Sequence, residues 1–139
     1  MKTETMEPLP SDHPTRTLAS FAGRLSFADL PVALVDRLKT CLLDAIGCGL
    51  YGLSLPWSRI VNQWIRHQEG RQESTLWRNG FKGPCANVTL GLGVMIHSMD
   101  FDDTHARAQL HPGAPVIAAA FAAAQISGCS TQQLLTGIV

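Results

Sequence analysis

Residues 31–53, PVALVDRLKTCLLDAIGCGLYGL, constrain the fold more than any other segment of the sequence. Apolar residues fall on most faces of the helix that this segment predicts, and its charged residues are Asp36, Arg37, Lys39 and Asp44. A helix that is apolar on most sides has to be covered by other elements. The segment therefore predicts a long, mostly buried helix, part of whose cover we expect from chain beyond Val139.

The rest of the chain also favours helices. Apolar residues recur at helical spacing over residues 17–25, 56–70, 86–104 and 112–128, and Leu18, Phe21, Ala22 and Leu25 form one such stripe. Ser130 and Gln133 have the spacing of a capping box at the start of a further helix. Residues 71–84 differ, because Asn79 and Gly80 form a turn signal that suits a short hairpin. We therefore predict an all-α fold with one short β-prone segment.

Composition narrows the range of partners. The 139 residues are 45% hydrophobic and include 11 basic and 11 acidic side chains, so the net charge is zero. A neutral chain without a cluster of Lys or Arg gives no electrostatic reason to expect a nucleic acid or an anionic membrane as partner. The longest apolar run, Ala114 to Ile126, is too short for the roughly 20 residues of a membrane span. The four cysteines lack metal-finger spacing, which predicts reduced thiols and a soluble, cytoplasmic protein.

Two regions are expected along the chain. Residues 1–15 alternate charges with prolines, which predicts a disordered leader rather than a signal peptide. Residues 16–139 predict an incomplete helical domain, because the sequence ends on LLTGIV without a signal that would end the last helix. We therefore expect this chain to be the front part of a longer protein.

The segment HSMDFDDTHARAQLHPG, residues 97–113, gathers three histidines and three aspartates. A helix that continues to about Thr104 would place His97, Asp100, Phe101 and Thr104 on one stripe. His111 lies immediately before the next predicted helix, where it would cap that helix and face back toward Asp100 and Thr104. The cluster is thus predicted to converge from two elements.

The chemistry that this cluster favours is proton transfer on an acid. A helix start attracts carboxylates through its free N–H groups, and its positive potential favours a neutral His111 that accepts a proton. We therefore predict a site for an anionic acid from which a carbon-bound proton is removed. Asp102, Asp103 and His105 are expected to hold the loop through caps and ion pairs.

Two other interpretations stay open. A divalent metal ion could bind His and Asp side chains at this spacing, with His111 as a further ligand, although no standard metal motif is matched. Each of these residues taken alone is more often structural, so a non-catalytic helical module is the second alternative. A dinucleotide site is excluded, because Ile96 stands where the G-x-G-x-x-G pattern requires glycine.

The segments HSMDFDDTHARAQLHPGAPVIAAAFAAAQISG and LASFAGRLSFADLPVALVDRLKTCLLDAIGCGLYG resemble the MmgE/PrpD family, most specifically in DFDDTH and the HPG that follows. The resemblance covers Thr17 to Val139. It implies the N-terminal portion of the large helical domain, without the lid domain, of a homodimeric lyase that uses no cofactor. The family contains 2-methylcitrate dehydratase, cis-aconitate decarboxylase and an iminodisuccinate epimerase, so a small di- or tricarboxylic acid is the implied substrate.

The resemblance also assigns roles to residues. It implies that Asp100, Thr104 and His111 bind the substrate, that His111 and Asp100 take part in catalysis, and that no residue binds a metal. The family's further catalytic histidine and lysines would lie beyond Val139, so the chain alone is expected to be inactive. A 2-methylcitrate dehydratase-like reaction is our first expectation, with decarboxylation or epimerisation as alternatives.

Overall fold

The computed structural model of the chain describes residue 10 and residues 13–77 and 80–139. The helices are α1 (Pro14–Arg24), the 3-10 helix η1 (Phe27–Asp29), α2 (Val32–Gly52), α3 (Pro56–Arg66), α4 (Cys85–Ile96), α5 (Gly113–Ser127) and α6 (Thr131–Ile138). Two short strands, β1 (Ser74–Thr75) and β2 (Lys82–Gly83), pair antiparallel. The predicted all-α class is confirmed.

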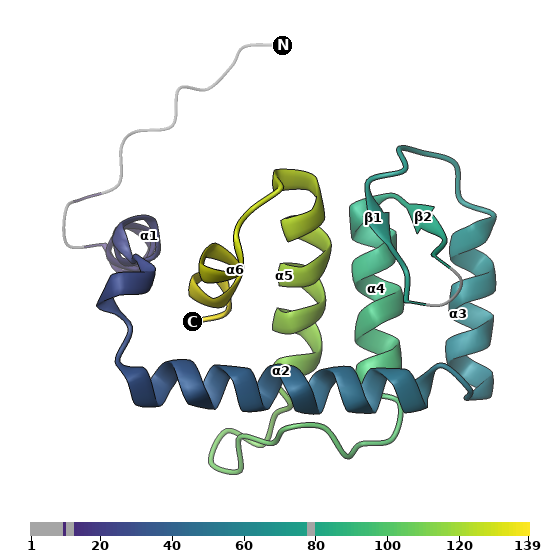
Figure 1. The fold of residues 1–139 in the computed structure, drawn as a ribbon, viewed down its shortest axis with the longest axis horizontal. Coiled ribbons are helices and arrows are strands. Elements are labelled where there is room, and N and C mark those ends of the chain that lie inside the picture. The colour runs from purple at the N-terminus through teal and green to yellow at the C-terminus, as the bar shows by residue number, and fades with distance from the viewer. Residues whose placement is uncertain (1–9, 11–12, 78–79) are drawn as a thin grey trace.

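Helix α2 lies across a row of other helices. Figure 1 shows α3, α4 and α5 standing side by side, with α2 crossing near the ends of α4 and α5 that residues 97–112 join. Helices α2 and α3 meet at an angle of 88°. Among the described helices, none is by itself long and apolar enough to cross a membrane. This arrangement puts the loop between α4 and α5 next to α2.

The core lies between α4 and α5 and reaches α2. Leu92, Met95, Ile117 and Ala118 belong to one buried cluster. Burial of a side chain of the size of Leu92 stabilises the fold by about 1.5–3 kcal/mol. A side chain at Gly52 would collide with the carbonyl oxygen of Met95, so α2 packs directly on the main chain of α4. Both ends of the loop between α4 and α5 therefore start from a closely packed core.

The prediction that residues 31–53 form a mostly buried helix is wrong for the described chain. Helix α2 buries one face, with Leu38, Ala45 and Gly49, while Leu43 is 72% exposed and Leu50 is also exposed. The reason is physical: α2 is apolar on several sides, and the elements that pack against it here cover only one of them.

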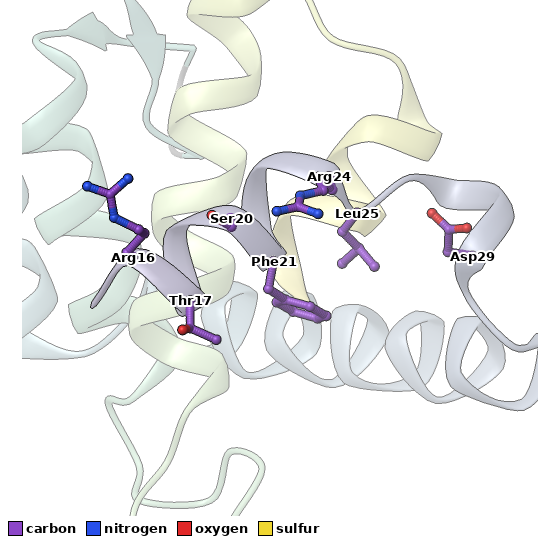
Figure 2. A pocket seen from close by; sticks show the side chains of 7 residues that line it. All are labelled: Arg16, Thr17, Ser20, Phe21, Arg24, Leu25 and Asp29. Atoms are coloured by element: carbon purple, nitrogen blue, oxygen red, sulfur yellow. The ribbon is translucent and has the colours of Figure 1, made fainter. Parts of the chain in front are cut away.

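The apolar stripe of α1 is likewise exposed. Leu18 and Phe21 face outward, and none of the residues of α1 is buried. Figure 2 shows Phe21 and Leu25 beside an open hollow of about 700 Å³, which Arg24 and Asp29 also line. This hollow contains none of the predicted site residues.

Local signals at the helix ends have mixed outcomes. The capping box is confirmed, since Gln133 N–H donates to Ser130 Oγ and Ser130 N–H donates to the Gln133 side chain. Helix α3 ends at Arg66, earlier than the predicted stop at Gly70. Helix α1 begins at Pro14, inside the segment 1–15 that was expected to be a leader, of which residues 1–9 and 11–12 lie outside the described residues.

The predicted hairpin is confirmed in part. Ser74 pairs with Gly83 and Thr75 with Lys82 in the two short strands. Asn79 of the predicted turn lies outside the described residues, whereas Gly80 adopts a φ of 64°, a conformation that glycine accepts without strain. The four cysteines are free thiols, as expected.

Candidate active site

The loop between α4 and α5 does not continue α4 as predicted. Helix α4 ends at Ile96, His97 is its C-cap, and Asp100 has a left-handed φ of 53°. The prediction of a helix to about Thr104, with Phe101 on an inward stripe, is therefore wrong, and Phe101 is 82% exposed. Asp residues tolerate the left-handed region better than most, and the turn that Asp100 makes there redirects the chain toward α5.

Asp102 lies at the centre of the loop and is 2% exposed. Its Oδ1 is 2.9 Å from Nδ1 of His97 and 3.4 Å from Nδ1 of His111. The two imidazole rings lie beside each other, with their centroids 4.9 Å apart. Burying a carboxylate costs free energy unless the group is paired or hydrogen-bonded. Here its two partners are His97, at the end of α4, and His111, just before the start of α5.

His111 brings the predicted site residues together. Its Nε2 is 3.2 Å from Oδ1 of Asp100, and its Nδ1 is 3.5 Å from Oγ1 of Thr104. Nδ1 also lies 3.1 Å from the carbonyl oxygen of Asp102. Helix α5 begins one residue later than predicted, with Pro112 as its N-cap, so His111 precedes the cap. Asp100 and Thr104 reach His111 from the loop rather than from a helical stripe.

Asp103 and His105 hold the loop in place. Oδ1 of Asp103 accepts the N–H of Gly113 at the start of α5, at 3.0 Å. The N–H of Asp103 donates to Oδ2 of Asp44 on α2, at 3.2 Å. Nδ1 of His105 accepts the N–H of Ala108, at 3.0 Å. The loop is therefore tied to both α2 and α5.

The carboxylates around the loop act on a nearby thiol. Burial is the main cause that raises the pKa of Cys48, and the negative charges of Asp44, Asp102 and Asp103 raise it further. A thiolate is disfavoured beside carboxylates, so Cys48 is a poor nucleophile at neutral pH. The carboxylates of Asp44, Asp102 and Asp103 therefore make the side of the loop next to α2 negatively charged.

A groove of about 480 Å³ opens beside the two histidines. His97 and His111 line it together with apolar side chains that include Leu90 and Val94 of α4 and Pro115 of α5. Its volume is within the range that holds a small organic molecule. This groove, unlike the larger hollow at α1, is lined by one of the predicted site residues, His111.

The same residues are the ones that a metal ion would use. His97, Asp102 and His111 offer one ligand atom each, all within 4.8 Å of one another. Two ligands on a tetrahedral zinc ion, each about 2.0–2.1 Å from the metal, lie about 3.4 Å apart. The contact of Asp102 with His97, at 2.9 Å, is a hydrogen bond that is shorter than this separation, so an ion would require the His97 ring to move.

Comparison with known proteins identifies the family. Residues 16–139 match the MmgE/PrpD N-terminal domain. The chain belongs to the MmgE/PrpD family. The expectation drawn from DFDDTH and HPG is confirmed, and this is a family of the lyase type.

Several MmgE/PrpD relatives are cis-aconitate decarboxylases or similar proteins. The chain is 34% identical over 118 residues to the cis-aconitate decarboxylase-like protein oryM of Aspergillus oryzae, covering 84% of this chain and 24% of that protein. It is 30% identical over 113 residues to cis-aconitate decarboxylase of Aspergillus terreus, with 81% and 23% covered. The mouse enzyme of the same name is 34% identical over 102 residues, with 70% and 21% covered. The chain thus spans about a quarter of the length of these relatives.

The sequence did not single out Asp102 as the centre of the cluster. Asp102 and Asp103 are adjacent and identical in type, and both were expected to hold the loop. Only the fold separates them, since Asp102 turns inward between two rings whereas Asp103 binds the start of α5. The i, i+5 spacing of His97 and Asp102 matches no helical contact, so periodicity gave no signal for this pair.

Proposed function

We propose that this chain contributes the proton-transferring site of a lyase that decarboxylates a small tricarboxylic acid of the cis-aconitate type. The relatives' names support decarboxylation, and they favour it over the 2-methylcitrate dehydration that was our first expectation. Both reactions act on the same class of acid, so 2-methylcitrate stays in the test. Because the chain spans about a quarter of its relatives' length, we also propose that complete activity needs a longer protein.

The chemistry requires a proton donor next to the carbon that loses carbon dioxide. When the bond between this carbon and the carboxyl carbon breaks, carbon dioxide leaves and the electron pair stays on the carbon that held it. That carbon then takes one proton, which Nε2 of His111 can deliver before the ring is reprotonated from water. Asp100, whose side chain is 81% exposed, lies at Nε2 on the path of that proton. The hydroxyl of Thr104 is a donor for a substrate carboxylate.

A single observation carries this proposal: Nε2 of His111 lies 3.2 Å from Oδ1 of Asp100, and His111 also lines a groove with the volume of a small-molecule site. A positioned acid or base of this kind contributes about 10²- to 10⁴-fold to a rate. Most of the side chains that line the groove beside the rings are apolar.

The proposal is tested by assaying carbon dioxide release and acid products from cis-aconitate and 2-methylcitrate in the protein that contains this chain. His111→Ala should lower kcat by about 10²-fold or more. Asp100→Asn should also lower kcat, since it removes the charge at Nε2. His105→Ala is the matched control, because His105 binds within the loop and should leave most activity.

Folding must be checked in each variant by its melting temperature. Near-normal turnover in a folded His111→Ala variant would refute the role of His111. Dehydration of 2-methylcitrate at a higher kcat/KM than decarboxylation of cis-aconitate would replace the proposed reaction. Activity lost on exhaustive chelation and restored by one metal ion would favour a metal-dependent enzyme instead.

A further inference from the structure

The buried carboxylate of Asp102 has no role in the chemistry described so far. Its side chain is fully buried, and both of its ion-pair partners are imidazoles. His97 Nδ1 lies 2.9 Å from Oδ1 and 3.3 Å from Oδ2 of this carboxylate. His97 therefore contacts the carboxylate from the end of α4, and His111 contacts it from the start of α5.

The contacts of His111 fix which ring nitrogen carries a hydrogen. A carbonyl oxygen can only accept a hydrogen bond, and the Asp102 carbonyl lies 3.1 Å from Nδ1 of His111. The Asp102 carboxylate lies 3.4 Å from the same nitrogen, where its negative charge favours a hydrogen on Nδ1. Nδ1 of His111 is therefore the donor in this buried contact, and the competing acceptor at Nε2, the carboxylate of Asp100, is exposed to water.

It follows that the exchangeable proton of His111 is on Nε2. This nitrogen faces Asp100, whose side chain is exposed, and not the buried end of the loop. A proton on Nε2 can therefore be given up without breaking the contact of Nδ1 with Asp102, as in other pairs of a carboxylate and an imidazole.

We propose that Asp102 is a positioning residue of the reaction. Its carboxylate and its main-chain carbonyl hold the hydrogen of His111 on Nδ1, so that Nε2 gives or takes the proton of the substrate. His97 donates to the same carboxylate and keeps it aimed at His111. This inference rests on the proposed function for its chemistry, but its geometric content can be measured without any turnover.

His105 provides an internal reference with the opposite arrangement. Its Nδ1 accepts the N–H of Ala108 at 3.0 Å, so a neutral His105 must carry its hydrogen on Nε2. Two histidines only six positions apart are thus expected in opposite tautomers. The difference arises from their partners, an N–H group for His105 and the Asp102 carbonyl oxygen, with the carboxylate nearby, for His111.

The first experiment is nitrogen NMR of the protein labelled with ¹⁵N at histidine, at a pH where the rings are neutral. The signals are assigned with His111→Gln and His105→Gln. We expect hydrogen on Nδ1 in His111 and on Nε2 in His105. A His111 ring with its hydrogen mainly on Nε2 overturns the proposal. The spectrum is also recorded with EDTA, and a change at His97 and His111 on chelation would replace the cluster by a metal site and overturn it as well.

The second experiment compares Asp102→Asn with Asp36→Asn, a substitution of the same chemistry on the exposed face of α2. Asp102→Asn should shift part of the His111 population to the Nε2–H tautomer and lower kcat by about 10²- to 10⁴-fold, with a smaller change in KM. Asp36→Asn should change neither. A folded Asp102→Asn variant that keeps both the tautomer and kcat overturns the proposal, and so does one that loses kcat with the tautomer unchanged.

The two proposals fail in different ways. If the protein turns over no acid of the panel, the proposed function fails, and the tautomers of His111 and His105 still decide the geometric claim. If Asp102→Asn does not fold, the spectrum of the unsubstituted protein still tests the assignment of the hydrogen to Nδ1.

Discussion

Gly113 at the start of α5 is the position where a single methyl group should disturb the candidate site most directly. A Cβ on Gly113 would overlap Oδ1 of Asp103, the oxygen that accepts the Gly113 N–H at 3.0 Å. Gly113 lies at an ordinary helical position, because its φ is not among the positive values. The cost of Gly113→Ala is therefore a displaced carboxylate and not a strained backbone.

The magnitude follows from the contact that is lost. A hydrogen bond to a charged group contributes about 1.5–3 kcal/mol. Replacing a helical glycine with alanine offsets about 0.5–1 kcal/mol of this. Gly113→Ala should therefore lower the free energy of unfolding by about 0.5–2.5 kcal/mol, which for a chain of this size lowers Tm by about 2–10 °C. Urea denaturation followed by circular dichroism at 222 nm measures the first quantity, and a thermal melt at the same wavelength measures the second.

A matched control, Gly47→Ala, should change the free energy of unfolding in the opposite direction. Gly47 lies inside α2, and a Cβ added there would meet no atom within 4 Å, so Gly47→Ala should stabilise the chain by about 0.5–1 kcal/mol. In an Asp103→Ala background the oxygen is gone, and Gly113→Ala should then cost little. The reasoning fails if Gly113→Ala is as stable as Gly47→Ala, or if its cost is the same with and without Asp103.

Two further predictions concern regions away from the site. Hydrogen bonds from the Ser26 hydroxyl and main chain lower the pKa of the exposed Asp29 below its ordinary value of 3.8, so the stability they add is present above that pH and is lost as the pH falls through the lowered value. Ser26→Ala should raise the pKa of Asp29, measured by carbon NMR of its carboxyl group. Leu92→Ala should lower the free energy of unfolding by about 2–5 kcal/mol, whereas Leu43→Ala, at an exposed position, should change it by less than about 0.5 kcal/mol.

The features that the sequence predicts correctly are local ones. The Ser130 and Gln133 box needs only four consecutive residues, and its hydrogen bonds form within the helix that it starts. The all-α class follows from apolar spacing within each segment, which depends on no distant contact. Such local patterns predict the helix correctly whichever elements pack around it.

The features that the sequence misses depend on distant contacts. Asp103 reaches Asp44, which is 59 positions away in the sequence, and this contact helps to turn the loop so that Asp102 faces inward. No local pattern encodes such a turn, and a continued helix was the simpler interpretation of His97 to Thr104. The exposure of Leu43 has the same origin. An apolar residue in the sequence indicates that a side chain can be buried, but it does not indicate which element would cover it.

The candidate site depends on the packing of the core because its two histidines lie at the two ends of one loop. His97 caps the end of α4, and His111 stands before the start of α5, so the relative position of these helices sets the distance between the rings. A packed core transmits small displacements rather than absorbing them. Asp102 can contact both rings only while α4 and α5 keep this spacing, and Gly93 of α4 lies beside Ala114 and Ala118 of α5 where the two helices pack. The small residues of the core and the charged residues of the loop are therefore parts of one arrangement that holds His111 between Asp100 and Asp102.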